Sequence, residues 1–260
     1  MQHMLAGPNI GIVTTRNIET GHVAHVFCAD SIIGHHAVSL KEVNYLLPLF
    51  LYPKEESDQH KLGSEWEKKA NLDPAFIGKL GECITGKSGL SDLPEGVSPE
   101  DVLYYIYAVM HSQTYRTRYA EYLKRDFARI PLPTDKHMFC QLAKKGQELV
   151  ALHLLKSPLL DTYITGFPEQ GSNEVTAVSY FEKDSKVWIN PLQFFTGVPK
   201  AVWNFVIGDD NPCERWLTDR KGHKLTYDDV QRWQRMVVAI KETMRLVEEI
   251  DSLIPTWPFA

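Results

Sequence analysis

The segment Tyr227–Ile250 constrains the fold of this chain more than any other stretch. It predicts one long amphipathic helix, because apolar residues recur at three- and four-residue steps. A stripe of this kind is nearly always part of a core, so we interpret it as structural. Its members are Val230, Trp233, Val237, Ile240, Met244 and Val247.

Shorter helical signals occur throughout the chain. Ser98–Pro99 is a strong N-cap followed by acidic residues. The helix that begins there and a second helix carrying Tyr115, Tyr119 and Tyr122 form a predicted helical hairpin interrupted at His111. We also expect a helical turn within 65–69 of the polar connection 53–70. The other expected helices are 73–83, 134–155, 199–206 and 212–217.

Two groups of β-like segments flank these helices. The first group, Asn9–Thr15, His22–Ala29 and Tyr45–Tyr52, predicts a small sheet. The second group, Val175–Phe181 and Lys186–Ile189, has a polar four-residue connection that is typical of a hairpin. The expected fold class is α+β, with small mixed or antiparallel β regions, a helical hairpin and long amphipathic helices.

Composition excludes several classes of protein. A chain of 260 residues with 43% hydrophobic residues can bury a core, which excludes a disordered tail. A net charge of -5 argues against a surface coated in positive charge, so nucleic acid would need a local basic patch. The four cysteines are far apart and have no CxxC spacing, so we interpret them as structural thiols. No secretion signal or membrane segment is recognisable, which predicts a cytoplasmic protein.

Catalytic motifs are weak in this sequence. Asn190-Pro191-Leu192-Gln193 begins like the base-gripping motif of adenine methyltransferases but lacks its second proline and closing aromatic residue. Asp184-Ser185-Lys186 has the spacing of a metal-dependent nuclease but falls in a predicted turn. We interpret both segments as turns. No nucleophile elbow or phosphate-binding loop is present, and we predict no catalytic or metal site in this chain.

Basic residues give a more informative pattern. Arg116 and Arg118 belong to a helix that also carries Lys124 and Arg125, so one flank could face phosphates. The spacing of Arg118, Glu121 and Arg125 equally fits intrahelical salt bridges on a solvated helix. A second basic group has a central glycine that would allow close approach to a groove, although a plain solvated turn is the alternative. This group contains Arg220, Lys221, His223 and Lys224.

Several long phrases resemble one family. They include His3-Met4-Leu5-Ala6-Gly7-Pro8-Asn9-Ile10-Gly11, the aromatic run 104–112, and Trp188-Ile189-Asn190-Pro191. The segments 47–53, 115–124, 129–131, 202–205 and 216–222 fit as well. In order along nearly the whole chain, they resemble the C-terminal target-recognition region of Type ISP restriction-modification enzymes and of related large adenine methyltransferases.

The resemblance implies a module that binds double-stranded DNA. It implies that methyltransferase and helicase-like domains, together with a nuclease, lie elsewhere in a longer parent chain. S-adenosylmethionine, ATP and magnesium would then serve those domains, and no cofactor is expected here. The start of the chain fits a fragment of a longer polypeptide or a short native start. A β-rich recognition part would comprise 1–56 and 161–225, and a helical part would comprise 57–160 and 226–260.

The resemblance does not fix which residues read bases, so the candidates rest on chemistry alone. Polar side chains in loops after strands suit base reading, and cations suit phosphate contacts. The DNA-binding candidates are Thr15, Arg16, Asn17, His35, His36, Ser39, Arg116, Arg118, Arg220, Lys221, His223 and Lys224.

Two other hypotheses remain. The chain could be a coupling module whose helices, above all Tyr227–Ile250, dock onto methyltransferase or motor domains without reading bases. It could also be a free-standing methyltransferase or nuclease with unfamiliar motifs.

Overall fold

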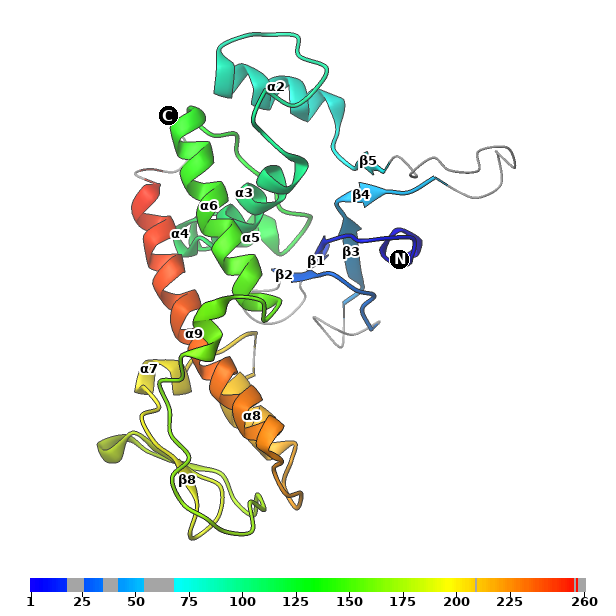
Figure 1. Ribbon diagram of the computed structural model, residues 1–260. Coiled ribbons are helices and arrows are strands. Elements are labelled where there is room, and N and C mark those ends of the chain that lie inside the picture. The colour runs from blue at the N-terminus through cyan, green and yellow to red at the C-terminus, as the bar shows by residue number, and fades with distance from the viewer. Residues whose placement is uncertain (18–25, 35–41, 54–67, 209, 255, 257–260) are drawn as a thin grey trace. The chain divides into compact units, whose positions relative to one another are not determined.

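The chain divides into two compact units in the computed structural model, which describes residues 1–17, 26–34, 42–53, 68–208, 210–254 and 256 (Figure 1). Unit 1 comprises Met1–Val150 and Leu246–Ala260, and unit 2 comprises Ala151–Arg245. Two helices, α6 (Lys136–His153) and α9 (Tyr227–Leu253), contribute residues to both units.

A three-stranded antiparallel sheet of order β2-β1-β3 forms the β part at the start of unit 1. All five residues of the central strand β1 are buried. This confirms the predicted small sheet, although β1 begins at Gly11 rather than Asn9, and residues 22–25 of the predicted second strand lie outside the described residues. The strands are β1 (Gly11–Thr15), β2 (Val26–Ala29) and β3 (Asn44–Pro48).

The predicted strand Tyr45–Tyr52 is interrupted at Leu49. The Leu49 backbone N–H donates to the Ile10 carbonyl, while its own carbonyl accepts from the Asn71 N–H. The chain therefore leaves β1 and begins a second pairing between β4 (Phe50–Leu51) and β5 (Lys69–Ala70). The expected helical turn at 65–69 is wrong at Lys69, because that residue lies in β5, and residues 65–67 lie outside the described residues.

Helices make up most of the rest of unit 1, and two begin at the predicted caps. Asp73 accepts hydrogen bonds from the Ala75 and Phe76 N–H groups, and Ser98 forms a capping box with Asp101. The second helix of the hairpin is not continuous, because Tyr119 leaves the helical conformation. The helices are α1 (Gln2–Leu5), α2 (Pro74–Thr85), α3 (Pro99–His111), α4 (Gln113–Arg118) and α5 (Ala120–Leu123).

The helix α6 ends before its predicted limit at Leu155. Leu155 has a φ of 57°, which is the left-handed conformation common after a helix C-terminus. The N–H groups of Lys156 and Ser157 both donate to the Ala151 carbonyl and so satisfy the end of the helix.

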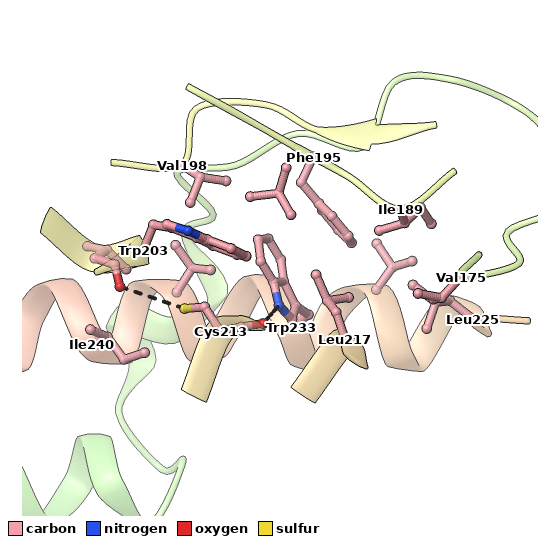
Figure 2. Close-up of a cluster of buried hydrophobic side chains, with 14 residues drawn as sticks. Val175, Ile189, Phe195, Val198, Trp203, Cys213, Leu217, Leu225, Trp233 and Ile240 are labelled. Carbon is pink, nitrogen blue, oxygen red and sulfur yellow. Dashed lines mark hydrogen bonds between the residues drawn. The ribbon is translucent and has the colours of Figure 1, made fainter. Parts of the chain in front are cut away.

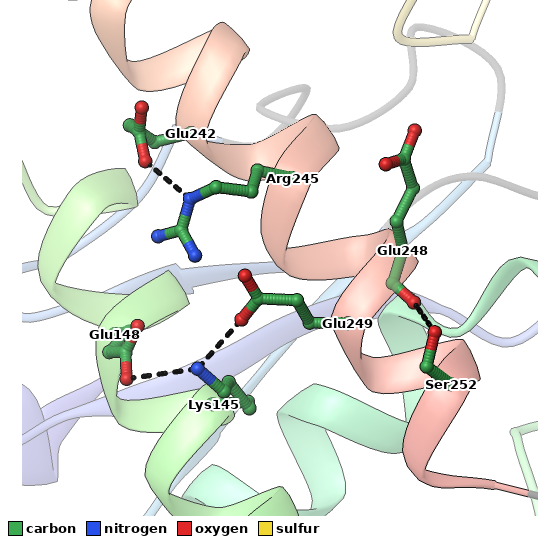
Figure 3. A network of polar contacts seen from close by, with 7 residues as sticks. All are labelled: Lys145, Glu148, Glu242, Arg245, Glu248, Glu249 and Ser252. Carbon is green, nitrogen blue, oxygen red and sulfur yellow. Dashed lines mark hydrogen bonds and ion pairs between the residues drawn. The ribbon is translucent and has the colours of Figure 1, made fainter.

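A lysine connects α6 to the end of α9 within unit 1. The Lys145 Nζ lies 2.7 Å from the Glu249 carboxylate and 3.5 Å from Glu148, as Figure 3 shows. The hydrogen bond to Glu249 is the main cause of the raised pKa of Lys145. Asp251, two residues further on, accepts hydrogen bonds from the hydroxyls of Ser112 and Thr114 at 2.5 and 2.9 Å. The last turns of α9 are therefore bound to the α3–α4 junction.

Unit 2 contains the predicted β-hairpin. The turn is a short 3-10 segment, η3 (Glu182–Asp184), followed by Ser185 with a φ of 51°. Val175 was expected in the first strand, but its backbone pairs with the segment 221–223 instead. The sheet has the order β6-β7-β8, with β6 (Ser179–Phe181), β7 (Lys186–Trp188) and β8 (Phe194–Phe195).

Three helical segments accompany this sheet. The helices α7 (Lys200–Trp203) and α8 (Pro212–Thr218) were predicted, although α7 is shorter than the expected 199–206. The 3-10 segment η2 (Pro158–Asp161) was not predicted.

Trp233 of α9 lies at the centre of the hydrophobic core of unit 2 (Figure 2). Its ring is fully buried at 4.1 Å from the Phe195 ring, and its indole N–H donates to the Cys213 carbonyl at 3.1 Å. Burial raises the pKa of the Cys213 thiol to about 12. The predicted stripe of α9 is confirmed as core at Val230, Trp233, Val237 and Ile240.

The fold class is α+β, as predicted: small antiparallel sheets accompany a helical hairpin and two long helices. Within the described ranges, no helix is both long and apolar enough to cross a membrane.

Candidate nucleic-acid interface

The basic turn 220–224 in unit 2 has a backbone held in place by a neighbouring segment. Gly222 adopts a φ of 82°, which favours glycine, and its N–H donates to the Val175 carbonyl at 2.8 Å. The Val175 N–H donates in return to the His223 carbonyl at 3.0 Å. Lys224 and Glu174 form a further β-bridge. The turn is therefore a defined structure that can present side chains at fixed positions.

Arg220 acts as an internal support of this turn. Its guanidinium lies 3.5 Å from the centre of the Trp216 ring and donates to the Trp216 carbonyl at 3.0 Å. It also lies 3.8 Å from the Asp229 carboxylate. Thr226 is the main cause of the lowered pKa of Asp229, and Arg220 adds to it. Only 33% of the Arg220 side chain is exposed, which limits its contact with an external ligand.

The three remaining basic side chains of the turn are exposed. Lys221, His223 and Lys224 form no side-chain hydrogen bond or ion pair within the part of the chain that the structure describes. Gly222, which separates them, adds no side chain that would block approach. The turn thus offers lysine ammonium groups and an imidazole to an anionic ligand.

A buried glutamine holds the segment against which the basic turn packs. The Gln193 amide oxygen accepts from the Asn173 N–H at 2.7 Å and from the Asn190 side chain at 3.0 Å. Its amide nitrogen donates to the Glu169 carbonyl at 3.0 Å and to the Asn173 side chain at 2.7 Å. Asn190 caps the turn by accepting from the N–H groups of Leu192 and Gln193. The segment 190–193 is the turn that the sequence predicts.

The nuclease-like triplet spans the end of the hairpin turn and the first residue of β7. Asp184 closes η3, Ser185 is left-handed, and the Lys186 ammonium lies 4.2 Å from the centre of the Phe194 ring. Among the residues described, no group of three or more His, Cys, Asp or Glu side chains could hold a metal ion.

In unit 1, the candidates after β1 differ in accessibility. Thr15 is buried, with 7% of its surface exposed, whereas Arg16 and Asn17 are exposed. The Arg16 guanidinium donates to the Asp126 carboxylate at 3.0 Å. A backbone hydrogen bond at Phe127 is the main cause of the lowered pKa of Asp126, followed by the bond from Arg16. The candidates His35, His36 and Ser39 lie outside the described residues.

The two arginines of α4 have different environments. Arg116 is half-buried, and its Nε donates to the Met110 carbonyl at 2.6 Å. Burial lowers the pKa of Arg116 to about 10, so it remains charged at neutral pH. Arg118 is exposed. Glu121 forms its ion pair with Lys124 at 3.0 Å, and not with the arginines whose spacing suggested one.

A groove that the sequence patterns did not predict lies within residues 115–131. It is lined by side chains that include Tyr119, Tyr122, Phe127, Arg125 and Arg129. The tyrosine spacing indicated only a helix with an apolar stripe, yet 75% of Tyr122 is exposed. The signal that would have revealed the groove is the alternation of arginines and aromatic residues in 115–129.

The family model described as the Type ISP C-terminal specificity domain matches residues 1–249. No curated protein matches the chain.

Three solved structures are similar in fold, each at under 20% sequence identity, and the chain spans at most 25% of any of them. A cryo-EM structure of a DrdV–DNA complex matches with a TM-score of 0.69 and 18% identity over 98% of this chain and 25% of that chain. A nuclease-deletion mutant of the Type ISP restriction-modification enzyme LlaGI, in complex with a DNA substrate mimic, matches with a TM-score of 0.61 and 19% identity over 94% and 21%. The ATP-dependent Type ISP restriction-modification enzyme LlaBIII, bound to DNA, matches with a TM-score of 0.66 and 19% identity over 94% and 16%.

Proposed function

Because the chain belongs to the Type ISP C-terminal specificity domain family, we propose that it recognises a short sequence in double-stranded DNA for a larger restriction-modification enzyme. The observation that supports this most directly is the basic turn 220–224. Its backbone is held by Val175, and its exposed cations are suited to phosphates at a defined register.

The basic residues of the turn differ in their contacts, and we assign them different roles for that reason. Lys221 and Lys224 contact phosphates, since their ammonium groups are exposed. Arg220 holds the turn through Trp216 and Asp229. Base reading then depends on polar side chains beside this anchor and after β1, where Arg16 and Asn17 are exposed.

The parent protein is proposed to be an adenine-specific methyltransferase and restriction enzyme. In this proposal, the specificity domain positions the target adenine for a methyltransferase domain elsewhere in the parent. S-adenosylmethionine, ATP and magnesium would serve those other domains. Support comes from the relatives: LlaBIII is an ATP-dependent Type ISP enzyme bound to DNA, and LlaGI was studied as a nuclease-deletion mutant.

The first experiment selects bound sequences from a random duplex pool with the 260-residue chain. Enrichment of one short motif is expected. The binding constant for that motif is then measured by fluorescence anisotropy over a range of salt concentrations. Failure to enrich any motif would exclude sequence reading by this chain, and binding that does not change with salt would exclude the proposed phosphate contacts.

The second experiment tests the basic turn. Each of the substitutions Lys221→Ala and Lys224→Ala should reduce the slope of log K against log salt by about 0.9, because one phosphate contact is lost. Lys241→Ala is the matched control, since Lys241 is an exposed residue of α9 and its substitution removes the same charge in the same unit. If all three variants weaken binding equally, the turn is not the anchor, and a coupling role becomes the better hypothesis.

A further inference from the structure

The groove in unit 1 has the size and the walls of a small-ligand site. We name it the aromatic groove and define it by Tyr115, Tyr119, Tyr122, Arg125, Phe127 and Arg129. Its volume is about 490 Å³, within the range of roughly 300–1,000 Å³ that is usual for sites of small molecules. A single nucleotide is a ligand of suitable size.

Hydrogen bonds and ring contacts fix the walls of the aromatic groove. The Tyr115 hydroxyl donates to the Arg129 carbonyl at 2.8 Å, and the Tyr115 and Tyr119 rings lie 5.1 Å apart. On the other side, the Phe127 ring makes an edge contact with Tyr45 of β3 at 5.1 Å. The groove therefore exists before any ligand binds, which reduces the entropic cost of binding.

The charges of the groove favour an anion. The exposed guanidinium groups of Arg125 and Arg129 form no hydrogen bond or ion pair within the described part of the chain. Asp126, which also lines the groove, is paired with Arg16 at 3.0 Å, and Arg129 contributes to its lowered pKa. The lining thus contains two arginines and one acidic residue, whose charge Arg16 already balances.

Exposed rings beside available arginines are a combination that binds nucleotides. Bases stack on aromatic side chains without regard to sequence, and arginine attracts the phosphates that connect them. Tyr122 is the most exposed ring of the groove at 75%, and 37% of Phe127 is exposed. Tyr122 therefore has a ring face that a base could cover, and it lies in the same lining as Arg125 and Arg129.

We propose that the aromatic groove binds one unstacked nucleotide of the DNA, with its base against Tyr122 and its phosphate near Arg125 and Arg129. This rests on the proposed DNA-reading function and adds a second mode of contact to it. Chemistry on a base requires the base to leave the stack, which leaves its former partner unpaired. A site for an unstacked nucleotide would lower the cost of that opening.

The test uses the selected duplex with one additional unpaired 2-aminopurine, moved stepwise through the site and its flanks. At one position we expect about tenfold tighter binding than for the intact duplex, with quenched 2-aminopurine fluorescence from stacking. Tyr122→Ala should abolish this gain. Tyr227→Ala in unit 2 is the matched control, because Tyr227 is equally exposed at 76%.

A second arm separates this proposal from the proposed function. A short single-stranded oligonucleotide with a central 2-aminopurine should bind the unsubstituted chain and lose affinity with Tyr122→Ala, whether or not the duplex is read. An oligonucleotide with an abasic central position should bind more weakly.

Three outcomes would overturn the proposal: no position of the unpaired base improves binding, the gain persists in Tyr122→Ala, or the abasic oligonucleotide binds equally well. In the last case the groove would be a phosphate site only. Circular dichroism of Tyr122→Ala checks that the variant is folded.

Discussion

At the scale of single residues, Gln193 shows how one buried polar side chain can organise a surface. Its amide group makes four hydrogen bonds and is fully buried, so each of its polar partners depends on Gln193 for a hydrogen bond. The partners Asn173 and Glu169 lie in the segment that leads to Val175 and hence to the basic turn. Gln193 therefore positions a surface without being exposed on it.

We predict that Gln193→Ala lowers the free energy of unfolding by about 3 kcal/mol, because buried donors and acceptors lose their partners. Urea unfolding measures the change. Gln170→Ala is the control, since Gln170 is exposed and its loss should cost no more than about 0.5 kcal/mol. Equal unfolding midpoints for the two variants would contradict the role assigned to Gln193.

Residue-level prediction from sequence succeeded where the partner is near in the chain. The caps at Asp73 and Ser98 were predictable because their hydrogen bonds reach only two or three residues ahead. Gln193 was not, because its partners Asn173 and Glu169 precede it by 20 and 24 residues. In the same way, no local pattern indicated that Arg16 would pair with Asp126, which is 110 residues away.

At the scale of elements, Gly146 sets how closely α3 and α6 approach. A Cβ atom at Gly146 would overlap the carbonyl oxygen of Tyr104, which is backbone and cannot rotate away. Gly146→Ala should therefore destabilise unit 1 by about 1–3 kcal/mol, although alanine is normally the better helix former. Thermal unfolding followed by circular dichroism measures this.

Gly78 in α2 is the matched control for that substitution. A Cβ atom there would meet only the Leu90 carbonyl oxygen at 3.4 Å, which is an ordinary contact. Gly78→Ala should stabilise the chain by up to about 1 kcal/mol. Opposite signs for the two variants are the expected result, and stabilisation by Gly146→Ala would show that the helices separate easily.

A capping box at the start of α9 links stability to pH. The Thr226 N–H and hydroxyl donate to the Asp229 carboxylate at 3.0 and 2.7 Å, which lowers the pKa of Asp229. A lowered pKa means that the carboxylate stabilises the folded state above its unfolded-state pKa and ceases to do so as pH falls through the folded value. The stabilising contribution should be complete at pH 7 and lost in strong acid.

Asp229→Ala should therefore cost about 1 kcal/mol at pH 7, and the difference from the unsubstituted chain should shrink below about pH 4. Urea unfolding at a series of pH values provides the measurement. Asp228→Ala removes the neighbouring exposed acid and serves as the control, since Asp228 takes no part in the cap. A pH-independent difference for Asp229→Ala would refute the assignment to the carboxylate.

Element types were more predictable than element limits. Periodicity located α9 and the hairpin of β6 and β7, because both patterns are local. The breaks at Leu49, Tyr119 and Leu155 were missed, because each depends on backbone geometry or on a hydrogen bond to another segment. The groove beside Tyr122 was not predicted, for the same reason.

At the scale of the whole molecule, the net charge of -5 determines how strongly the chain should bind DNA without regard to sequence. An acidic surface with local basic groups is repelled by most phosphates, so non-specific binding should be weak. At physiological salt we expect the selected duplex to bind at least about 1,000-fold more tightly than a scrambled duplex. Competition anisotropy with both duplexes measures the ratio, and a ratio near one would exclude a specificity function for the isolated chain.

The family could be recognised from long phrases in the sequence, and its match over residues 1–249 confirms that recognition. The division into a β-rich recognition part and a helical part stays a prediction, as do the individual DNA contacts. Neither follows from family membership, because the family match identifies the domain and not the residues that contact DNA.

The contact of Asp251 with Ser112 joins residues that are 139 positions apart. On the ribosome, the helices α3 and α4 emerge long before the turn of α9 that completes their junction. The contact between Ser112 and Asp251 therefore cannot form until residues 151–245 have been synthesised. Loss of the residues from position 251 onward would thus remove the partner of Ser112 and Thr114 and weaken a junction that lies far from the cut in the sequence.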